Sequence, residues 1–342
     1  MTGRAGLFPY HAGRFLPRSF KLQISRALNN WTSRSILNNL HTLSNGDKPI
    51  VAGPWVGEVG FELLYWVPFL SWVTEQFNIA PDRLVIISRG GVSDWYQHVS
   101  SRYHDVFDQL SADEFRTRNA ERSSAVGEQK QVVVTNFDLS LLQPILSNLR
   151  CGMDRVLHPS TMYRLFRLYL WGHVQSSWIE NYAQYRRFKL SGISNLLTRL
   201  PSEYVAVKFY YSDSFPATRE NRKLVREIMS TLRESGPVVS LSTGLSLDDH
   251  EESNEEEDLT LQGIQNGLSP ATNLALQSAI VARARSWVGT YGGFAYLAPF
   301  YGVPSTAYLS DRDKINRQHL ALAQHVFSQL SPEPLLEIRE TG

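Results

Sequence analysis

The sequence predicts an α/β protein made of two doubly wound, Rossmann-like domains that face a cleft. Short apolar runs alternate with helical patterns along most of the chain, which is typical of parallel sheets with crossover helices. The alternation stops over an aromatic and basic stretch at 151–200 and then restarts. This interruption divides the chain into two units. The chain has 342 residues, a length that suits two domains of about 150 residues each.

The N-terminal segment differs in charge from the rest of the chain. No acidic residue precedes Asp47, whereas Arg4, Arg14, Arg18, Lys21, Arg26 and Arg34 all do. Apolar residues recur there at near-helical spacing, namely Phe20, Ile24, Leu28, Trp31 and Leu37. We therefore expect residues 1–46 to form a basic amphipathic arm. Such an arm packs on the body, stays poorly ordered, lies on an anionic membrane surface or acts as a transit peptide.

Residues 47–200 are expected to form the first domain. Three short apolar runs predict buried strands at 48–55, 82–91 and 130–138, of which the first ends at Gly-Pro and the second at Gly-Gly. Helices are expected at 61–77 and around 96–110, with a loop near 119–129. Pro68 should kink the first of these helices or mark its start. Helices within 151–200 then bridge to the second domain.

Residues 201–330 are expected to form the second domain, and 331–342 a tail. The same patterns predict strands at 203–211, 237–244, 286–293 and 303–310. Helices are predicted between and after them, at 218–236, 271–284, 294–302 and 315–327. Ligands of open α/β sheets bind at the carboxyl ends of the strands. Two glycine-rich turns, 57–60 and 289–293, follow predicted strands and should lie at one cleft.

Bulk composition excludes several classes of protein. The formal net charge is +1, with 34 basic and 33 acidic residues, so global charge favours no nucleic-acid partner. A single cysteine, Cys151, rules out an internal disulfide and fits a reducing compartment. No apolar run reaches the roughly 18–20 residues of a transmembrane helix. We expect a cytoplasmic protein, peripheral at the inner face of a membrane if the arm binds lipid.

Two segments resemble a known family. "ARSWVGTYGGFAYLAPFYGVPSTAYL" (284–309) is similar to the donor-site segment of glycosyltransferases with the GT-B fold, especially the heptosyltransferase-like branch. "IVAGPWVGEVGFELLYWVPFL" (50–70) resembles the first strand, glycine loop and helix of the same fold. The order of elements matches over roughly 48–330. The donor turn departs from that branch, because Thr290-Tyr291-Gly292-Gly293 lacks its usual acidic residue.

The resemblance implies a glycosyltransferase that moves a sugar from a nucleotide-activated donor to an acceptor hydroxyl. The acidic residue of the first glycine loop often serves there as catalytic base, which makes Glu58 the candidate base. A base takes the acceptor proton, and N–H donors or cations stabilise the leaving phosphate. Glu62 is a second candidate, to orient the acceptor or to pair with a basic group. The alternative for both acids is helix capping.

The donor is expected at the second glycine turn. Free N–H groups at the start of a helix bind phosphate, and adjacent glycines allow close approach. Lys208 ends a predicted strand and is a candidate for the leaving phosphate; the alternative is a surface lysine. The candidate donor-binding residues are Lys208, Tyr211, Thr243, Gly244, Thr290, Tyr291, Gly292 and Gly293.

The acceptor side is expected around the turns of the first domain. Its candidates are Gly57, Gly60, Arg89, Asp94 and Trp95, with Trp95 either stacking on a sugar or buried in the core. Asp248, Asp249 and His250 carry metal-ligand chemistry, but adjacent residues seldom face one ion, so we expect no metal. No cofactor is expected beyond the nucleotide-sugar co-substrate. The alternatives are a pyruvyl-type transferase on the same two-lobed fold and a non-catalytic nucleotide- or sugar-binding protein.

Overall fold

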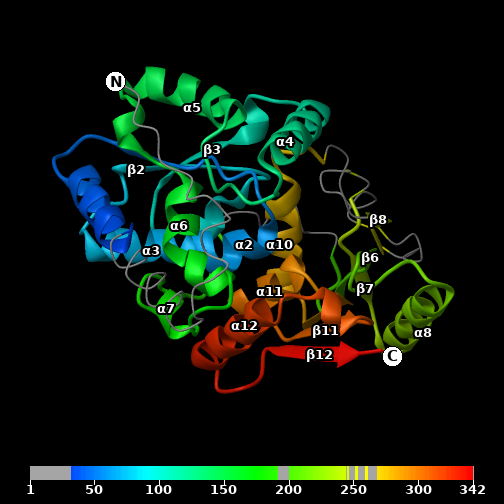
Figure 1. Cartoon of the computed structure of the whole chain (residues 1–342). Helices are drawn as coiled ribbons and strands as arrows, with labels where there is room; N and C mark the ends of the chain where they lie inside the picture. The colour runs from blue at the N-terminus through cyan, green and yellow to red at the C-terminus, as the bar shows by residue number, and fades with distance from the viewer. Residues whose placement is uncertain are drawn as a thin grey trace.

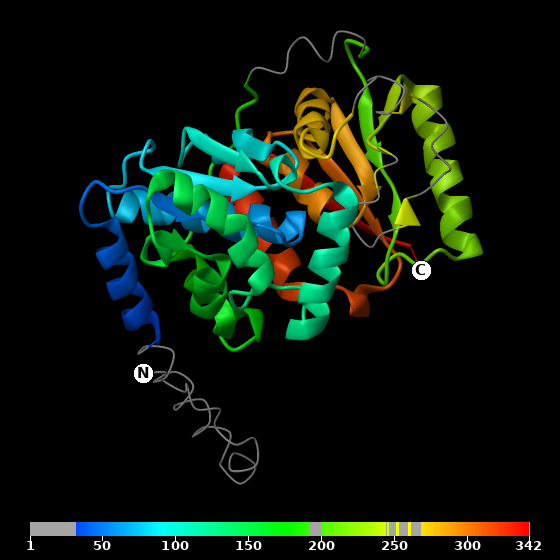
Figure 2. The ribbon, with the colours of Figure 1, turned by 90° about the horizontal axis from the view of Figure 1, so that it is seen from above.

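The computed structural model describes residues 32–191, 200–243, 245, 251–252, 259–260 and 268–341. The chain forms two α/β units, coloured blue to green and yellow-green to red in Figure 1, and the two lie side by side when seen from above in Figure 2. Each unit is built on its own parallel sheet. The predicted α/β class with two parallel sheets is therefore confirmed.

The first sheet has the strand order β3-β2-β1-β4, and every pair in it is parallel. Its strands are β1 (Ile50–Ala52), β2 (Leu84–Ser88), β3 (Arg102–Asp105) and β4 (Val156–Leu157). Side chains alternate across the sheet. Val51 and Val85 pack on one face against α4 (Ala112–Val126) and α5 (Asn136–Leu149), and Ile50 and Leu84 join the opposite core. The sheet is thus covered on both faces.

One continuous helical rod follows β1. It begins with α2 (Val59–Phe61), passes through a π-helical segment η2 (Glu62–Trp66) and continues as α3 (Val67–Gln76). Pro68 lies in the first turn of α3, directly after the π-helical segment, so it marks the change from π-helix to α-helix within the rod. The rod itself begins at Val59, so the expectation that Pro68 marks the start of the helix is wrong. Short 3₁₀ turns, η3 (Val92–Tyr96) and η4 (Val106–Asp108), flank β3.

Three predictions for this unit are wrong. Residues 96–110, expected as a helix, hold β3 between two 3₁₀ turns, and 119–129, expected as a loop, lies largely within α4. The strand expected at 130–138 does not form, since α5 begins at Asn136. Val133 and Val134 are 50% and 42% exposed, because the position beside β1 is taken by the two-residue strand β4.

Among the described residues of 151–200, the expected helices lie in the first part. After the 3₁₀ turn η5 (Met153–Arg155) and β4 come α6 (Pro159–Leu170) and α7 (Ser177–Glu180). Residues 183–191 then run without regular structure along the first unit, and Phe188 stacks on Phe300 of the second. This segment therefore joins the two units by packing as well as by sequence.

The second sheet has the order β12-β11-β10-β5-β7-β9, again all parallel. Its strands are β5 (Val205–Lys208), β7 (Val238–Ser240), β9 (Leu259–Thr260), β10 (Ser286–Thr290), β11 (Ser305–Leu309) and β12 (Leu336–Glu340). A separate antiparallel pair joins β6 (Tyr210–Tyr211) to β8 (Glu251–Glu252). Residues 331–342, expected as a tail, thus supply an edge strand of the sheet.

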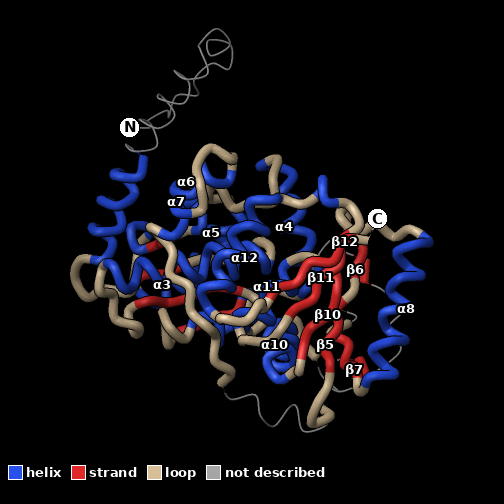
Figure 3. The backbone as a smooth tube through the Cα atoms, turned by 90° about the horizontal axis from the view of Figure 1, so that it is seen from below, coloured by secondary structure: helices blue, strands red, loops and turns tan. Residues whose placement is uncertain are grey.

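Helices cover both faces of the second sheet. Figure 3 shows α8 (Arg219–Ser235) on one side of the fanned strands, and α10 (Asn273–Arg283) and α11 (Gly293–Phe300) on the other. The 3₁₀ turn η7 (Arg312–Lys314) and then α12 (Arg317–Leu330) follow β11. The amphipathic pattern of 218–236 predicted α8 to within a residue at each end, because its apolar side chains recur on one face.

One hydrophobic core runs through both units. It joins the inner face of the first sheet and the rod α2–α3 to α10, α11 and α12 of the second unit. Residues 32–44 are helical and add Ile36, Leu40 and Leu43 to the same core. This part of the predicted arm therefore packs on the body. Its other basic residues lie in 1–31, outside the described residues. Within the described chain, no helix is both long and apolar enough to span a bilayer.

Candidate functional site

The two predicted glycine turns meet where the units touch. A Cβ atom at Gly293 would lie 2.6 Å from the backbone nitrogen of Gly60 and 3.2 Å from its Cα atom. A Cβ atom at Gly60 would lie 3.2 Å from the Cα atom of Gly293. Only glycine permits this approach of two backbones. We call the residues Gly57, Glu58, Gly60, Gly292 and Gly293 the glycine seam.

Glu58 occupies the N-cap position of α2 with extended backbone (φ −68°, ψ 147°), yet its side chain makes no capping hydrogen bond. The side chain is exposed at the start of the rod α2–α3. Burial and then the charge of Glu58 raise the pKa of Tyr163 well above its usual range. Glu58 thus occupies the cap position of α2 without the capping hydrogen bond that the alternative reading expects.

Glu62 has the opposite environment. Its side chain is fully buried and lies in the π-helical segment, facing the end of β2. Ser88 Oγ donates a hydrogen bond to Glu62 Oε1 over 2.5 Å, and the hydroxyl of Tyr96 donates to the same oxygen. Oε2 has no hydrogen-bond partner among the described residues. Burial raises the pKa of Glu62 to about 7, against the lowering effects of the Arg89 charge and the two hydrogen bonds.

Side chains from distant elements hold the backbone in front of Glu58. The guanidinium of Arg89 donates to the carbonyl oxygen of Gly57 over 2.6 Å. Gln131 accepts from the Val56 N–H at 3.0 Å and donates to the carbonyl of Pro54 at 2.8 Å. Sequence reasoning identified Arg89 but missed Gln131, because a lone glutamine after a loop matches no motif.

Hydrogen bonds to Tyr210 hold the second glycine turn, 289–293. Thr290 is fully buried, and its hydroxyl donates to the Tyr210 carbonyl at 2.8 Å and accepts from the Tyr210 N–H at 3.1 Å. The Tyr210 hydroxyl donates to the carbonyl of Tyr291 at 3.2 Å. A Cβ atom at Gly292 would lie 1.7 Å from that hydroxyl. Thr290 and Gly292 therefore shape the turn, and α11 begins directly behind it.

Lys208 reaches the start of α11. It lies at the end of β5, paired in register with Gly289 of β10. Its ammonium donates to Gln277 Oε1 at 3.1 Å and lies 4.8 Å from the ring centroid of Phe294, in the first turn of α11. Lys208 is half-buried, and its ammonium lies against the side chain of the first turn of that helix. The structure brings this predicted residue to the predicted turn.

Other predicted donor residues lie elsewhere or face inward. Tyr211 stacks on Phe215 at 6.2 Å, with the Arg222 guanidinium 4.6 Å from its ring centroid, on the face covered by α8. Thr243 is 3% exposed, and its hydroxyl accepts from the N–H of Leu245. The hydroxyl of Tyr291 bonds to that of Tyr296 at 2.5 Å, inside the second unit. Gly244 lies outside the described residues.

Two predicted acceptor residues join parts of the molecule together. Asp94 accepts hydrogen bonds from the N–H of Ser191, at 3.0 Å, and from the hydroxyl of the same residue. Trp95 is fully buried, and its indole N–H donates to Ser278 Oγ of α10 at 3.1 Å. The alternative that Trp95 belongs to the core is confirmed, and the expectation that it rims a sugar site is wrong.

An aromatic cluster beside the seam was not predicted. Phe61 of α2 packs edge-on against His319 of α12, with ring centroids 4.5 Å apart. His319 Nδ1 lies 3.2 Å from the hydroxyl of Tyr65. Burial and then the charge of Lys130 lower the pKa of His319 to about 3. The Lys130 ammonium itself lies 5.4 Å from the Phe61 ring centroid. A neutral imidazole accepting from Tyr65 fits these contacts.

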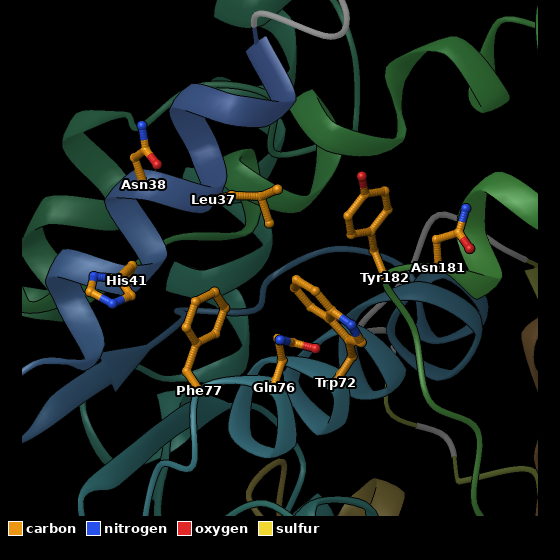
Figure 4. A pocket seen from close by; sticks show the side chains of 8 residues that line it. All are labelled: Leu37, Asn38, His41, Trp72, Gln76, Phe77, Asn181 and Tyr182. Carbon is orange, nitrogen blue, oxygen red and sulfur yellow. The ribbon is translucent and has the colours of Figure 1, made fainter.

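A hollow of about 520 Å³ lies away from these residues. Figure 4 shows Leu37, Trp72, Phe77 and Tyr182 turned toward its centre, between the helix 32–44, the end of α3 and the segment after α7. No predicted site residue lines it. Among the described residues, no three His, Cys, Asp or Glu side chains group closely enough to hold a metal ion. Asp248, Asp249 and His250 fall outside the described part.

Comparisons with known proteins give structural likenesses only. No protein-family model and no curated protein matches the chain. The structures found include a glycosyl transferase of family 9 from Veillonella parvula, at 12% identity and TM-score 0.45, with 86% of each chain covered. E. coli ADP-heptose LPS heptosyltransferase II gives 12% and 0.44, with 86% of this chain and 90% of that one covered.

E. coli heptosyltransferase WaaC with ADP gives 12% identity and a TM-score of 0.41, covering 86% of this chain and 93% of that one. All three TM-scores are below 0.5.

Proposed function

We propose that the chain is a glycosyltransferase that moves a sugar from a nucleotide-activated donor to an acceptor hydroxyl. The observation that carries this proposal is the contact between Gly60 and Gly293, which brings the candidate base turn and the candidate phosphate turn together. The resemblance of both turns to glycosyltransferase segments agrees with it. Glu58 acts as the base, and the start of α11 with Lys208 receives the leaving phosphate.

Glu58 is the acid best placed for proton transfer. Its side chain is exposed at the seam and makes no capping bond, whereas the carboxyl of Glu62 is enclosed between Ser88 and Tyr96. The carboxylate takes the acceptor proton while the acceptor oxygen bonds to the sugar. In this proposal Glu62 ties the rod α2–α3 to β2 and does not touch the substrate.

The donor phosphate is assigned to the other side of the seam. As the sugar leaves, its bond to the phosphate oxygen breaks and negative charge grows on the nucleotide. The first N–H groups of α11 have no partners within their own helix and point toward such an anion. Lys208 adds a full positive charge beside them, 4.8 Å from the Phe294 ring of the same turn.

The base assignment is tested by Glu58→Gln, which keeps the size of the side chain and removes its basicity. Incubation of the wild-type chain with a panel of nucleotide sugars and glycan acceptors first identifies a turnover. We then expect kcat to fall about 10²- to 10⁴-fold, with the nucleotide Kd unchanged by calorimetry. Glu121→Gln is the control, since Glu121 is an exposed acid on α4 of the same unit. Near wild-type turnover in Glu58→Gln would exclude this base.

The phosphate assignment is tested by Lys208→Met. A charge-assisted hydrogen bond lost from a binding site weakens nucleotide affinity about tenfold to a hundredfold. Lys223→Met on the exposed face of α8 is the control. A bulky residue at Gly292 would be a poorer test, because its Cβ atom meets the Tyr210 hydroxyl and the whole turn must move. An unchanged Kd in Lys208→Met contradicts the assignment.

The same panel separates this proposal from the alternatives. Nucleotide binding without any turnover would indicate a binding module, and transfer of another group would indicate a different transferase on this fold. Peripheral contact with a membrane stays a prediction, because most of the basic residues that favour it lie in 1–31.

A further inference from the structure

The backbone that leads into Glu58 is held by side chains of the same unit, chiefly by Gln131. We propose that Gln131 is a positioning residue that fixes the turn 53–58 and thereby the carboxylate of Glu58. Its effect on catalysis rests on the proposed function, whereas its hold on the turn does not. The region was predicted as loop and strand, so nothing in the sequence suggested such a contact.

At the start of the turn, the N–H groups of Gly53 and Trp55 still donate to the carbonyls of Leu157 and Ile87 in the neighbouring strands, at 3.0 and 2.9 Å, and Val56 lies beyond these contacts. Beyond β1, the N–H and the carbonyl of Val56 both need partners, because Val56 is 2% exposed. Gln131 Oε1 accepts from the N–H at 3.0 Å, and Asn119 Nδ2 donates to the carbonyl at 3.3 Å. Gln131 Nε2 also donates to the carbonyl of Pro54 at 2.8 Å. Two side-chain amides thus replace a neighbouring strand.

The orientation of the Gln131 amide is fixed by a carboxylate behind it. Gln131 Nε2 donates to Asp138 Oδ1 at 3.0 Å, so the nitrogen cannot exchange places with the oxygen. The other oxygen of Asp138 accepts from the N–H and the hydroxyl of Thr135, both at 2.7 Å. Burial would raise the pKa of Asp138, but its contacts with His158 and Thr135 lower it, so the carboxylate stays charged.

A buried arginine holds the two amides in relation to each other. Arg122 Nε donates to Asn119 Oδ1 at 2.8 Å, and Nη2 donates to the carbonyl of Gln129 at 2.7 Å. Arg122 is 4% exposed and Gln131 1% exposed, so water does not replace these bonds readily. The segment carrying Gln131 is therefore attached to α4, and both are attached to Val56.

The far end of the turn is fixed as well. Arg89 holds the Gly57 carbonyl, and the carbonyl of Glu58 accepts from the Glu62 N–H at 3.1 Å within the rod. Within the turn 53–58, Glu58 is the exposed residue. Misplacing a catalytic group by about 1 Å can lower a rate about a hundredfold. Release of the turn should therefore affect kcat more than nucleotide binding.

The decisive variant is Gln131→Glu, which keeps the shape of the side chain and makes the hold dependent on pH. A protonated carboxyl can still accept from Val56 and donate one O–H, whereas the ionised form faces Asp138 and the Pro54 carbonyl with no proton to donate. Asp138 of α5 and burial oppose ionisation. Arg122 of α4 and His158, whose Nε2 lies 3.6 Å from Asp138 Oδ1, favour it.

The experiment measures hydrogen exchange of the full-length chain, corrected for the intrinsic effect of pH, in peptides covering 53–61 and 84–88. For Gln131→Glu we expect wild-type protection of 53–61 at pH 5 and at least ~10-fold faster exchange at pH 8, with 84–88 unchanged. The kcat of transfer should fall about 10- to 100-fold at pH 8, with the donor KM unchanged.

Gln109→Leu is the matched control, because Gln109 donates one hydrogen bond to the Leu141 carbonyl in the same unit. It should leave both readouts unchanged. If protection of 53–61 from exchange in Gln131→Glu does not depend on pH, the proposal is wrong. It is also wrong if 84–88 loses as much protection as 53–61, or if kcat stays normal although 53–61 exchanges faster. If the wild-type chain transfers no sugar, the proposed function fails, and exchange alone decides whether Gln131 holds the turn.

Discussion

Glu62 and His319 are buried titratable side chains on two sides of the same helical rod. Burial raises the pKa of Glu62 to about 7, from 4.5, and lowers that of His319 to about 3, from 6.5. Each group therefore stays neutral in the folded protein over a range in which it is charged when unfolded. The neutral form of His319 suits its site, since the Tyr65 hydroxyl lies within hydrogen-bond distance of its ring. At Glu62 burial alone favours the neutral form, because the hydrogen bonds from Ser88 and Tyr96 lower its pKa.

The two shifts act on stability with opposite sign. Between pH 4.5 and 7 the folded chain holds a proton on Glu62 that the unfolded chain has lost, so the free energy of unfolding falls as pH rises. Between pH 3 and 6.5 the unfolded chain holds a proton on His319 that the folded chain lacks, so the same free energy rises with pH. Over the shared range from 4.5 to 6.5 the two slopes cancel.

Single variants should separate the two slopes. For Glu62→Gln the measured quantity is the free energy of unfolding of the wild-type chain minus that of the variant. This difference should decrease by about 1.4 kcal/mol per pH unit from pH 4.5 to 7, about 3 kcal/mol in all. In His319→Asn it should increase with pH at a similar slope between pH 3 and 6.5. Urea unfolding at half-unit steps from pH 3 to 8 measures both. A difference curve for Glu62→Gln that is flat in pH contradicts the buried neutral carboxyl.

At the scale of elements, the sequence patterns correctly predicted the strands that lead into the glycine turns. The elements that they predicted between residues 96 and 138 were wrong. β2, β5 and β10 are apolar runs with neighbours on both sides, so composition alone indicated them. The run Val132–Val134 looked the same but found no place in a sheet, because β4 lies beside β1. That choice depends on packing across 100 residues of chain, which local patterns do not contain.

A signal for the missed helices was nevertheless present. "SADE" at 111–114 and "TNFD" at 135–138 are capping boxes, and in the structure each begins a helix, α4 and α5. Recognising them would have replaced the expected loop and the expected strand by two helices. The contacts of Asn119 and Gln131 with the turn 53–58, and of Arg122 with Asn119, would still have been missed, because they depend on where α4 packs.

The cap of α4 gives a prediction for the element. Ser111→Ala removes the hydroxyl that accepts from the Glu114 N–H and donates to its carboxylate. We expect the free energy of unfolding to fall by about 1 kcal/mol, as urea unfolding would show. Exchange at Val56 should not change, because Asn119 lies two turns further along the helix. Faster exchange in 53–61 would mean that the first turn of α4 also holds the seam.

At the scale of the whole molecule, the two units behave as one body in their packing. A single core runs from the helix 32–44 to α12, and Trp95 donates across the units to Ser278 of α10. Domains joined by small polar interfaces usually move independently. Here the interface is apolar and includes backbone contact at the seam, so the unfolding of both sheets should be coupled. The two glycine turns therefore touch where sequence reasoning expected a cleft between them.

Gly293→Ala tests this coupling. The added methyl would lie 2.6 Å from the Gly60 nitrogen, so the units must separate locally, and the φ angle of Gly293 lies outside the left-handed values that require glycine. We expect calorimetry to show a lower Tm and a broadened or divided transition, whereas the wild-type chain unfolds in one. Gly127→Ala is the control, since it strains a left-handed residue (φ 80°) with open space around it. That strain costs about 1–2 kcal/mol without touching the seam. If Gly293→Ala loses no more stability than Gly127→Ala and still unfolds in one transition, the contact between the turns does not join the two units.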